Sequence, residues 1–138
     1  MLITHIPLHC VNEAAIRYHV PAKLIIAVLE TEQGKVGGIT INKNGTYDIG
    51  PMAINSLWLS ELKKHGISEH DIQFDPCINL KVGAWILSKK IANQNNVLVG
   101  IGDYNSHNAQ LNAIYYNKVK INFFKIIIFL NSRETYDN

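Results

Sequence analysis

Glu32 is the residue of this chain whose type and position most clearly suit chemistry. It lies on a predicted helix that begins at Pro21 and ends before Gly34. The apolar residues of that helix recur at three- and four-residue steps, and Glu32 falls within their stripe: Leu24, Ile25, Val28, Leu29. Burial and the negative end of the helix dipole both favour the protonated carboxyl and raise its pKa. Glu32 is therefore a candidate general acid, or else a structural carboxylate paired with an Arg or a backbone donor.

A second carboxylate, Asp48, lies in the turn-rich segment NGTYDIGPMAIN, residues 44–55. One carboxyl on an apolar helix face and another in a polar turn can have well-separated pKa values. Glycosidases use such a pair as the acid and as the nucleophile or electrostatic stabiliser. On spacing alone, however, Asp48 is more often a turn residue whose side chain bonds to its own backbone. Both interpretations stay open at this point.

The elements that would position these carboxyls are mostly helical. Helical spacing or capping signals predict helices over residues 10–18, 21–32, 54–64 and 76–93, and a last helix from about residue 108. Asp75 and Pro76 are a typical N-cap and first-turn residue for the longest of them. Residues 35–50 contain alternating apolar positions and an Asn-Gly pair, which predict a small β-hairpin. Residues 100–106 are rich in turn-forming types and are expected to form a loop.

Composition narrows the classes of protein and of site. The chain has 138 residues, of which 47% are hydrophobic, and this suits one globular domain. A formal net charge of +2 without basic clusters gives no case for nucleic-acid binding. The six histidines show no metal-ligand spacing, so we expect no metal site and no cofactor. The two cysteines, Cys10 and Cys77, are either two buried thiols or one long-range disulfide.

Neither end of the chain reads as a segment that would cross a membrane. The first nine residues lack a basic region and a long apolar stretch, so they do not read as a signal peptide. Phe123 to Leu130 form an apolar run that Lys125 interrupts, and this run is too short to span a bilayer. We expect it to be a last core element, or an exposed adhesive tail.

Four motifs occur in order along the chain: EQG from residue 32, NGTYDIGPMAIN from 44, a third made of DPCIN followed by GAWIL between 75 and 87, and GDYNS from 102. In this order they resemble the lysozyme-like lytic transglycosylases that accompany type III and type IV secretion, conjugation and type IV pilus systems. The match covers about residues 10–116, and residues 117–138 form a divergent tail. The resemblance implies a single domain over residues 1–138 with a mainly α (α+β) lysozyme-like fold, in which a small β-hairpin lobe lies beside a helical lobe.

The resemblance also implies chemistry for the two carboxyls. In this family a glutamate at the position of Glu32 protonates the glycosidic oxygen between N-acetylmuramic acid and N-acetylglucosamine of peptidoglycan. It then acts as base on the sugar's 6-hydroxyl and leaves a 1,6-anhydro product without consuming water. The segment around Asp48 is also similar to the part of animal-type lysozymes that carries their second catalytic carboxylate. Hydrolysis by Glu32 and Asp48 together is therefore an alternative, and a catalytically weak peptidoglycan-binding assembly subunit is another.

Further site residues follow only from the resemblance. The expected substrate-binding residues are Met52, Ala53, Ile54, Asn55, Tyr104 and Asn105. The hydroxyl of Tyr104 is expected near the catalytic glutamate. Ala53 stands where the family usually has Gln, which removes a possible hydrogen bond to the glycan and puts subsite preference in doubt. Cys10 and Cys77 match a pair that exported members often have, which implies a disulfide.

Location and partners are implied in the same way. The resemblance implies a periplasmic or cell-envelope enzyme whose partners are peptidoglycan glycan strands and secretion, conjugation or pilus assembly proteins. Neither nucleic acid nor stable membrane insertion is expected. The N-terminus departs from this picture, so we expect a mature form, a misplaced start or another export route.

Overall fold

The computed structural model describes residues 6–137 of the chain. Its elements follow one another in this order: α1 (Leu8–Tyr18), α2 (Ala22–Glu32), β1 (Ile39–Ile41), β2 (Tyr47–Ile49), β3 (Ile54–Asn55), the 3-10 helix η1 (Ser56–Trp58), α3 (Leu59–Lys64), α4 (Glu69–Phe74), α5 (Pro76–Ala92), α6 (Val97–Asp103) and α7 (Ala109–Asp137). The fold is mostly helical with one small antiparallel sheet, as the sequence predicts.

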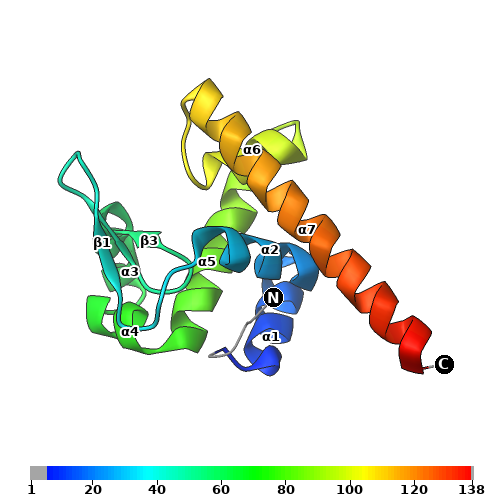
Figure 1. Cartoon of the computed structure of the whole chain (residues 1–138). Coiled ribbons are helices and arrows are strands. Elements are labelled where there is room, and N and C mark those ends of the chain that lie inside the picture. The colour runs from blue at the N-terminus through cyan, green and yellow to red at the C-terminus, as the bar shows by residue number, and fades with distance from the viewer. Residues whose placement is uncertain (1–5, 138) are drawn as a thin grey trace.

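The elements form two lobes that share α5 (Figure 1). The sheet, α3 and α4 lie at one end of α5, whereas α1, α2, α6 and α7 make up the other lobe, with α7 on its outside. Helix α5 contacts α1, α4, α6 and β3, and α7 packs against α2 and α6. The core is made of aliphatic side chains from both lobes, including Ile25, Val28, Ile49, Leu80 and Leu87, all fully buried. Burying such side chains is the main driving force for joining the lobes.

The small lobe is built on the predicted hairpin. Strands β1 and β2 pair antiparallel, and Gly45 in the connecting turn has φ +87°, a conformation that favours glycine. Strand β2 also pairs with β3, so the sheet order is β1-β2-β3. In this register Asp48 lies opposite Thr40 on one side and Asn55 on the other. Asp48 is thus on the central strand.

One residue ends α4 and begins α5. Asp75 is the C-cap of α4 and the N-cap of α5, and its Oδ1 accepts hydrogen bonds from the backbone N–H groups of Cys77 and Ile78. This confirms the predicted N-cap, with Pro76 in the first turn. The start of α4 has its own signal, a capping box between Ser68 and Asp71.

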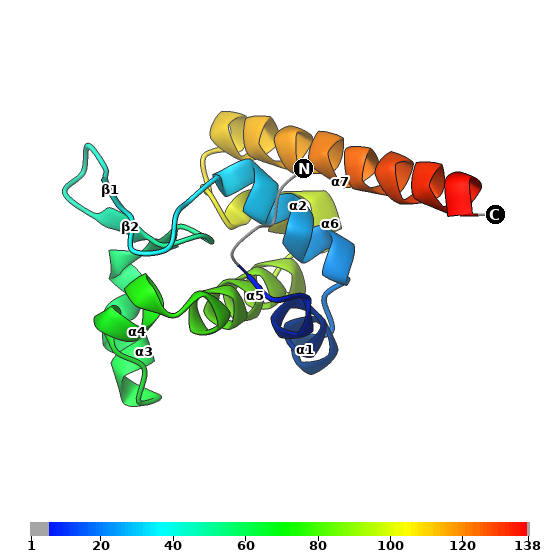
Figure 2. The ribbon, with the colours of Figure 1, turned by 60° about the horizontal axis from the view of Figure 1, so that its bottom comes forward.

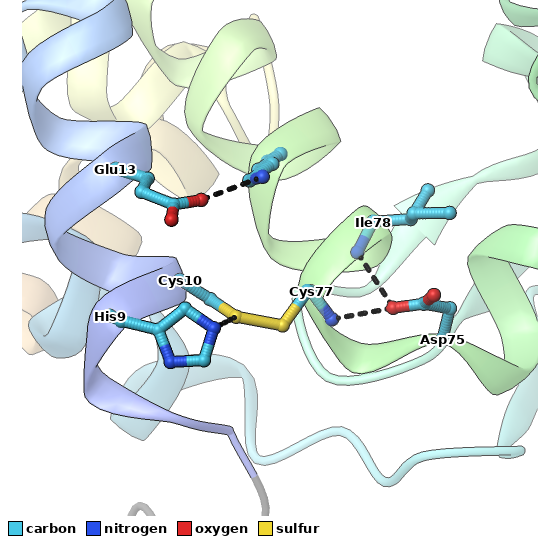
Figure 3. Close-up of a disulfide and its surroundings, with 7 residues drawn as sticks. His9, Cys10, Glu13, Asp75, Cys77 and Ile78 are labelled. Carbon is cyan, nitrogen blue, oxygen red and sulfur yellow. Dashed lines mark hydrogen bonds and ion pairs between the residues drawn. A yellow bond between two sulfur atoms is a disulfide. The ribbon is translucent and has the colours of Figure 1, made fainter.

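A disulfide joins Cys10 of α1 to Cys77 of α5 (Figure 3). The two cysteines are 67 positions apart in sequence, so the disulfide ties α1 to the start of α5. His9 lies beside it, with Nε2 3.5 Å from the sulfur of Cys10. These three side chains bring their ligand atoms within 4.8 Å of one another, but the sulfurs are bonded to each other rather than available as thiolates.

Two predicted elements differ from the structure. Ile54 and Asn55 form strand β3 instead of starting a helix, and the α-helical part begins only at Leu59. The segment from residue 100 was predicted as a loop because of its turn-forming residues, yet Val97–Asp103 is helix α6, capped by the side chain of Asn96. Gly100 is buried in α6. The residue must be glycine, because a Cβ there would lie 2.6 Å from the Cα of Ile91. Close packing, not a turn, explains this glycine.

The apolar run near the C-terminus belongs to α7, a helix of 29 residues. Ile126 is 1% exposed, and Phe123 packs against the core, so part of the run is the predicted last core element. Other members of the run stay exposed, among them Phe124 and Ile128. Within residues 6–137, none of the helices combines the length and the apolar character needed to cross a bilayer.

Candidate active site

Glu32 is the last residue of α2, where the chain turns toward the small lobe. Leu24, Ile25, Val28 and Leu29 are buried on the predicted stripe, and Glu32 continues that stripe as a half-buried side chain. The helix stops because Gln33 adopts the left-handed conformation with φ +53°. The next residue must be small, since a Cβ on Gly34 would collide with the carbonyl oxygen of Gly50. The end of α2 is therefore fixed against the turn that follows β2.

The carboxyl of Glu32 accepts a hydrogen bond from the hydroxyl of Tyr115 on α7, at 2.7 Å between that oxygen and Oε2. The pKa of Glu32 is raised from 4.5 to about 7 by three effects together: burial raises it, the Tyr115 hydrogen bond lowers it, and the negative charge of Asp48 raises it. Burial is the largest of these effects. A carboxyl with this pKa is present in both protonation states near neutral pH, as a group that both gives and takes a proton needs to be.

Two tyrosines stand beside Glu32. The ring of Tyr104 stacks on that of Tyr115, with 6.3 Å between ring centroids, and the Tyr104 hydroxyl donates to the carbonyl oxygen of Met52 at 2.7 Å. Burial, then the charges of Glu32 and Asp48, raise the pKa of Tyr104 well above its usual range. Burial and the charge of Glu32 raise the pKa of Tyr115 in the same direction. Both hydroxyls therefore stay protonated and act as donors.

The family resemblance implies that the hydroxyl near Glu32 is that of Tyr104. In the structure Tyr104 is close enough for the charge of Glu32 to affect it, but its hydrogen-bond partner is Met52. Tyr115 is the tyrosine bonded to Glu32. It is 83 positions away in sequence, and its helical spacing alone cannot distinguish a core tyrosine from one that reaches a carboxyl.

Asp48 lies on β2 as a half-buried side chain. Its Oδ1 accepts a hydrogen bond from Nδ2 of Asn55, at 3.1 Å. Asn55 is itself held in place, because it also donates to Thr46 and accepts from the backbone N–H of Leu57. Asp48 is thus bonded to a side chain on the neighbouring strand, and not to its local backbone as in an Asx turn. The sheet register places the Asp48 carboxylate beside Asn55, and its negative charge raises the pKa of Glu32.

The turn between β2 and β3 is supported from below by Asn79 of α5, a fully buried side chain. Its Nδ2 donates to the carbonyl oxygens of Ile49 and Ile72, and its Oδ1 accepts from the backbone N–H of Met52 at 2.8 Å. Gly50, with φ +70°, must be glycine here because a Cβ would collide with the Asn79 amide. Asn79 belongs to the DPCIN motif, but nothing in the sequence indicated this role.

The remaining predicted substrate-binding residues differ in their access to a ligand. Met52 and Ile54 are 0% and 1% exposed, so their side chains belong to the core, and their part in substrate binding stays a prediction. Met52 packs on Gly83 of α5, where a Cβ would lie 2.6 Å from its terminal methyl. Ala53 and Asn55 are half-buried and Asn105 is exposed, so these three remain open to contact. Ala53 has φ +52°, which is uncommon for a residue with a Cβ.

The chain is similar in sequence to a known protein family and to several known proteins. The family model described as "Transglycosylase SLT domain" matches residues 9–122. Invasion protein IagB of Salmonella typhimurium is 37% identical over 98 residues, which are 70% of this chain and 61% of that protein. Protein IpgF of Shigella flexneri is 30% identical over 98 residues, 70% of this chain and 64% of that protein. A "peptidoglycan-binding-like protein" of Escherichia coli O157:H7 is 34% identical over 105 residues, 70% of this chain and 63% of that protein. The chain spans less than two thirds of the length of these relatives.

Proposed function

Because the chain belongs to the transglycosylase SLT family, we propose that it cleaves the β-1,4 bond between N-acetylmuramic acid and N-acetylglucosamine in peptidoglycan, leaving a 1,6-anhydro-muropeptide. The observation that carries this proposal is the half-buried carboxyl of Glu32 with a pKa of about 7. A single group of this acidity can serve as acid in the first half of the reaction and as base in the second.

In the first half, protonated Glu32 gives its proton to the glycosidic oxygen. The bond from that oxygen to the anomeric carbon of the muramic acid breaks, and the N-acetylglucosamine end leaves as an alcohol. In the second half, the Glu32 carboxylate takes the proton of the 6-hydroxyl, whose oxygen forms the new bond to the anomeric carbon. Glu32 regains its proton, and no water is consumed. The Tyr115 hydroxyl stabilises the intermediate carboxylate by its hydrogen bond.

Asp48 supplies the second charge of the site. Positive charge develops at the anomeric carbon when the glycosidic bond breaks, and a fixed carboxylate nearby stabilises it. Asn55 holds the Asp48 carboxylate in one orientation. The same carboxylate favours a second candidate function, hydrolysis by a lysozyme-type muramidase, because a pair of carboxyls can also direct a water molecule or a covalent step. Asp48 is therefore the residue on which the two reactions diverge.

The biological role follows from names and motifs, not from the site itself. The names of two of the relatives refer to invasion and to peptidoglycan binding. Together with the motif resemblance, these names support a protein of the periplasm or cell envelope that opens the wall locally for a secretion, conjugation or pilus apparatus. A catalytically weak subunit that only binds the wall is the opposing case.

Product analysis on purified sacculi tests the proposal. The purified chain should release anhydro-muropeptides, and Glu32→Gln should release none while still unfolding in a single cooperative thermal transition. Glu30→Gln, a half-buried glutamate two positions earlier on the same helix, is the matched control and should stay active. Muropeptides with reducing ends would instead identify a muramidase. Sacculi left intact with protein bound would identify a wall-binding subunit.

A further inference from the structure

Helix α7 exposes a row of large apolar side chains on the face that points away from the core. Ile114, Ile121, Phe124 and Ile128 are 54%, 55%, 50% and 67% exposed, and we call these four residues the α7 outer stripe. At about 100° per residue they fall within an arc of about 80° on one side of the helix. Along the axis they extend for about 21 Å. Ile121, Phe124 and Ile128 are neighbours at three- and four-residue steps, and the exposed Asn117 lies on the same side of the helix between them and Ile114.

The opposite face of α7 is the one that builds the protein. Tyr115, Val119 and Ile126 are 6%, 1% and 1% exposed, and they pack into the core. Figure 2 shows α7 lying across α2 and α6 on the outside of the helical lobe, with its C-terminal part extending beyond them. Core packing therefore explains one face of this helix and leaves the apolar character of the outer stripe without a structural purpose.

Cations border the outer stripe on both sides. Helix geometry places Lys118 and Lys125 along one edge and Lys120 near the other, and all three are exposed. No Asp or Glu occurs between residues 104 and 133, so this part of the chain has only positive formal charges. Lysines beside an apolar strip can bury their methylene stems along it and keep their ammonium groups in a polar layer.

From this pattern we propose that the α7 outer stripe binds the surface of an anionic lipid bilayer, with the helix lying in the plane of the headgroups. A helix with an apolar face flanked by lysines inserts that face at the boundary of headgroups and acyl chains. Anionic headgroups then attract the lysines. The attachment is distinct from spanning the bilayer, for which α7 is not apolar enough. It goes beyond the proposed cleavage reaction and does not depend on it.

A second copy of this chain is a poorer occupant of the same surface. Two outer stripes packed together would bring the lysines of both helices side by side without an acidic residue from either α7 to pair with them between residues 104 and 133. Like charges so placed oppose association. An anionic headgroup layer meets the same lysines with opposite charge.

The proposed orientation leaves the candidate active site accessible. Tyr115, which is bonded to Glu32, lies about 140° around the helix from the centre of the outer stripe. A bilayer against the outer stripe would therefore be on the far side of α7 from Glu32. The protein would be held at a membrane while the side with Glu32 and Asp48 points away from it.

Vesicle co-sedimentation of the full chain tests this proposal. The vesicles are phosphatidylcholine alone, or phosphatidylcholine with phosphatidylglycerol. Ile121→Ser/Phe124→Ser/Ile128→Ser removes most of the apolar stripe, and Lys118→Gln/Lys120→Gln/Lys125→Gln removes the flanking charges. The matched control, Ile16→Ser/Ile41→Ser/Leu57→Ser, changes three apolar residues on other elements that are 77%, 80% and 74% exposed. Each variant is first checked for an unchanged thermal transition.

The unmodified chain should bind the anionic vesicles and bind the neutral ones less. The serine variant should lower the partition onto anionic vesicles about tenfold or more. The glutamine variant should lower it by about a hundredfold on anionic vesicles only, because each of the three lysines near such a surface contributes about fivefold. No binding by the unmodified chain, or an equal loss in the control variant, would overturn the proposal. So would light scattering that shows a dimer, dissociated by the serine changes, in the absence of vesicle binding.

Discussion

The hydroxyl of Tyr115 donates a hydrogen bond to Oε2 of Glu32, with 2.7 Å between the two oxygens. This bond joins the first half of α7 to the last residue of α2. The contact works against burial: burial raises the pKa of Glu32, whereas the hydrogen bond to its carboxylate lowers it. The pKa of about 7 is the balance of the two with the charge of Asp48. Tyr115 thus limits how far burial weakens Glu32 as an acid.

Removing that hydroxyl should make Glu32 a weaker acid. A hydrogen bond to a charged group contributes about 1.5–3 kcal/mol, so in Tyr115→Phe the pKa of Glu32 should rise by about one to two units. The alkaline limb of the rate profile on sacculi should move to higher pH by the same amount. Tyr116→Phe, on the neighbouring residue, is the control and should leave the profile in place. An unshifted profile in Tyr115→Phe would show that Tyr115 does not set this acidity.

Stability should report the same carboxyl without any substrate. The pKa of Glu32 rises from 4.5 to about 7 on folding, so the folded state holds the proton more tightly than the unfolded state. This contribution is complete below pH 4.5 and is lost as the pH rises to about 7. Relative to Glu32→Gln, the unmodified protein should therefore lose about 3 kcal/mol of unfolding free energy over that interval. Denaturant melts of both proteins across the range measure the difference, in which other titrating groups cancel. A constant difference would contradict a raised pKa.

Asp48→Asn should change both acidity and turnover. Its charge raises the pKa of Glu32, so neutralising it should lower that pKa and shift the rate profile toward acid. If the carboxylate also stabilises positive charge at the anomeric carbon, kcat should fall about a hundredfold or more. The asparagine can keep a contact with Asn55, so the fold should be retained. Near-normal kcat would make Asp48 a structural residue of the sheet.

Asn79 should matter for stability rather than chemistry. Asn79→Ala would leave the carbonyl oxygens of Ile49 and Ile72 and the N–H of Met52 without their present partner. Buried polar groups left in this state cost about 1–3 kcal/mol each, so the midpoint of thermal unfolding should fall by roughly 10 °C or more. The control is Asn117→Ala on α7, whose exposed amide bonds only within its own helix to Ala113 and whose loss should be nearly neutral. Similar melting of the two variants would argue against the proposed support.

Reduction of the Cys10–Cys77 bridge should lower the melting temperature. Closing a segment of 67 positions restricts the unfolded chain by about 4 kcal/mol in the loop-entropy model. The thermal transition should therefore fall when a phosphine reductant is added. A Cys10→Ser/Cys77→Ser variant should melt at the lower temperature with or without reductant. Identical melting of the oxidised and reduced protein would contradict a stabilising bridge.

Local signals explain what the sequence predicted well. The helix before Glu32, the hairpin around Gly45 and the cap at Asp75 all depend on residues a few positions apart, which helical or turn chemistry fixes directly. Tyr115 and Asn79 act on partners that are far away in sequence or in another element, and no spacing rule reaches them. Asn55, which orients Asp48, was expected only to contact glycan.

Several glycine and apolar residues have a packing role that their residue types and motifs did not indicate. Gly100 and Gly102 read as turn residues, although both are buried in α6, where neighbouring groups leave no room for a side chain. Met52 and Ile54 read as binding residues because of their motif, but they fill the core beneath it. In each case the residue type reports packing, and packing is a property of the whole fold.

Asp75 is the whole connection between α4 and α5. A hinge needs a few residues that are free to change their backbone angles, and a single residue whose side chain already fastens the next helix offers none. The small lobe therefore cannot swing about this joint when a long polymer enters or leaves. Within residues 6–137 the chain passes between the two lobes at one other place, the segment between α2 and β1, so a change in the angle between the lobes depends on the backbone of that segment.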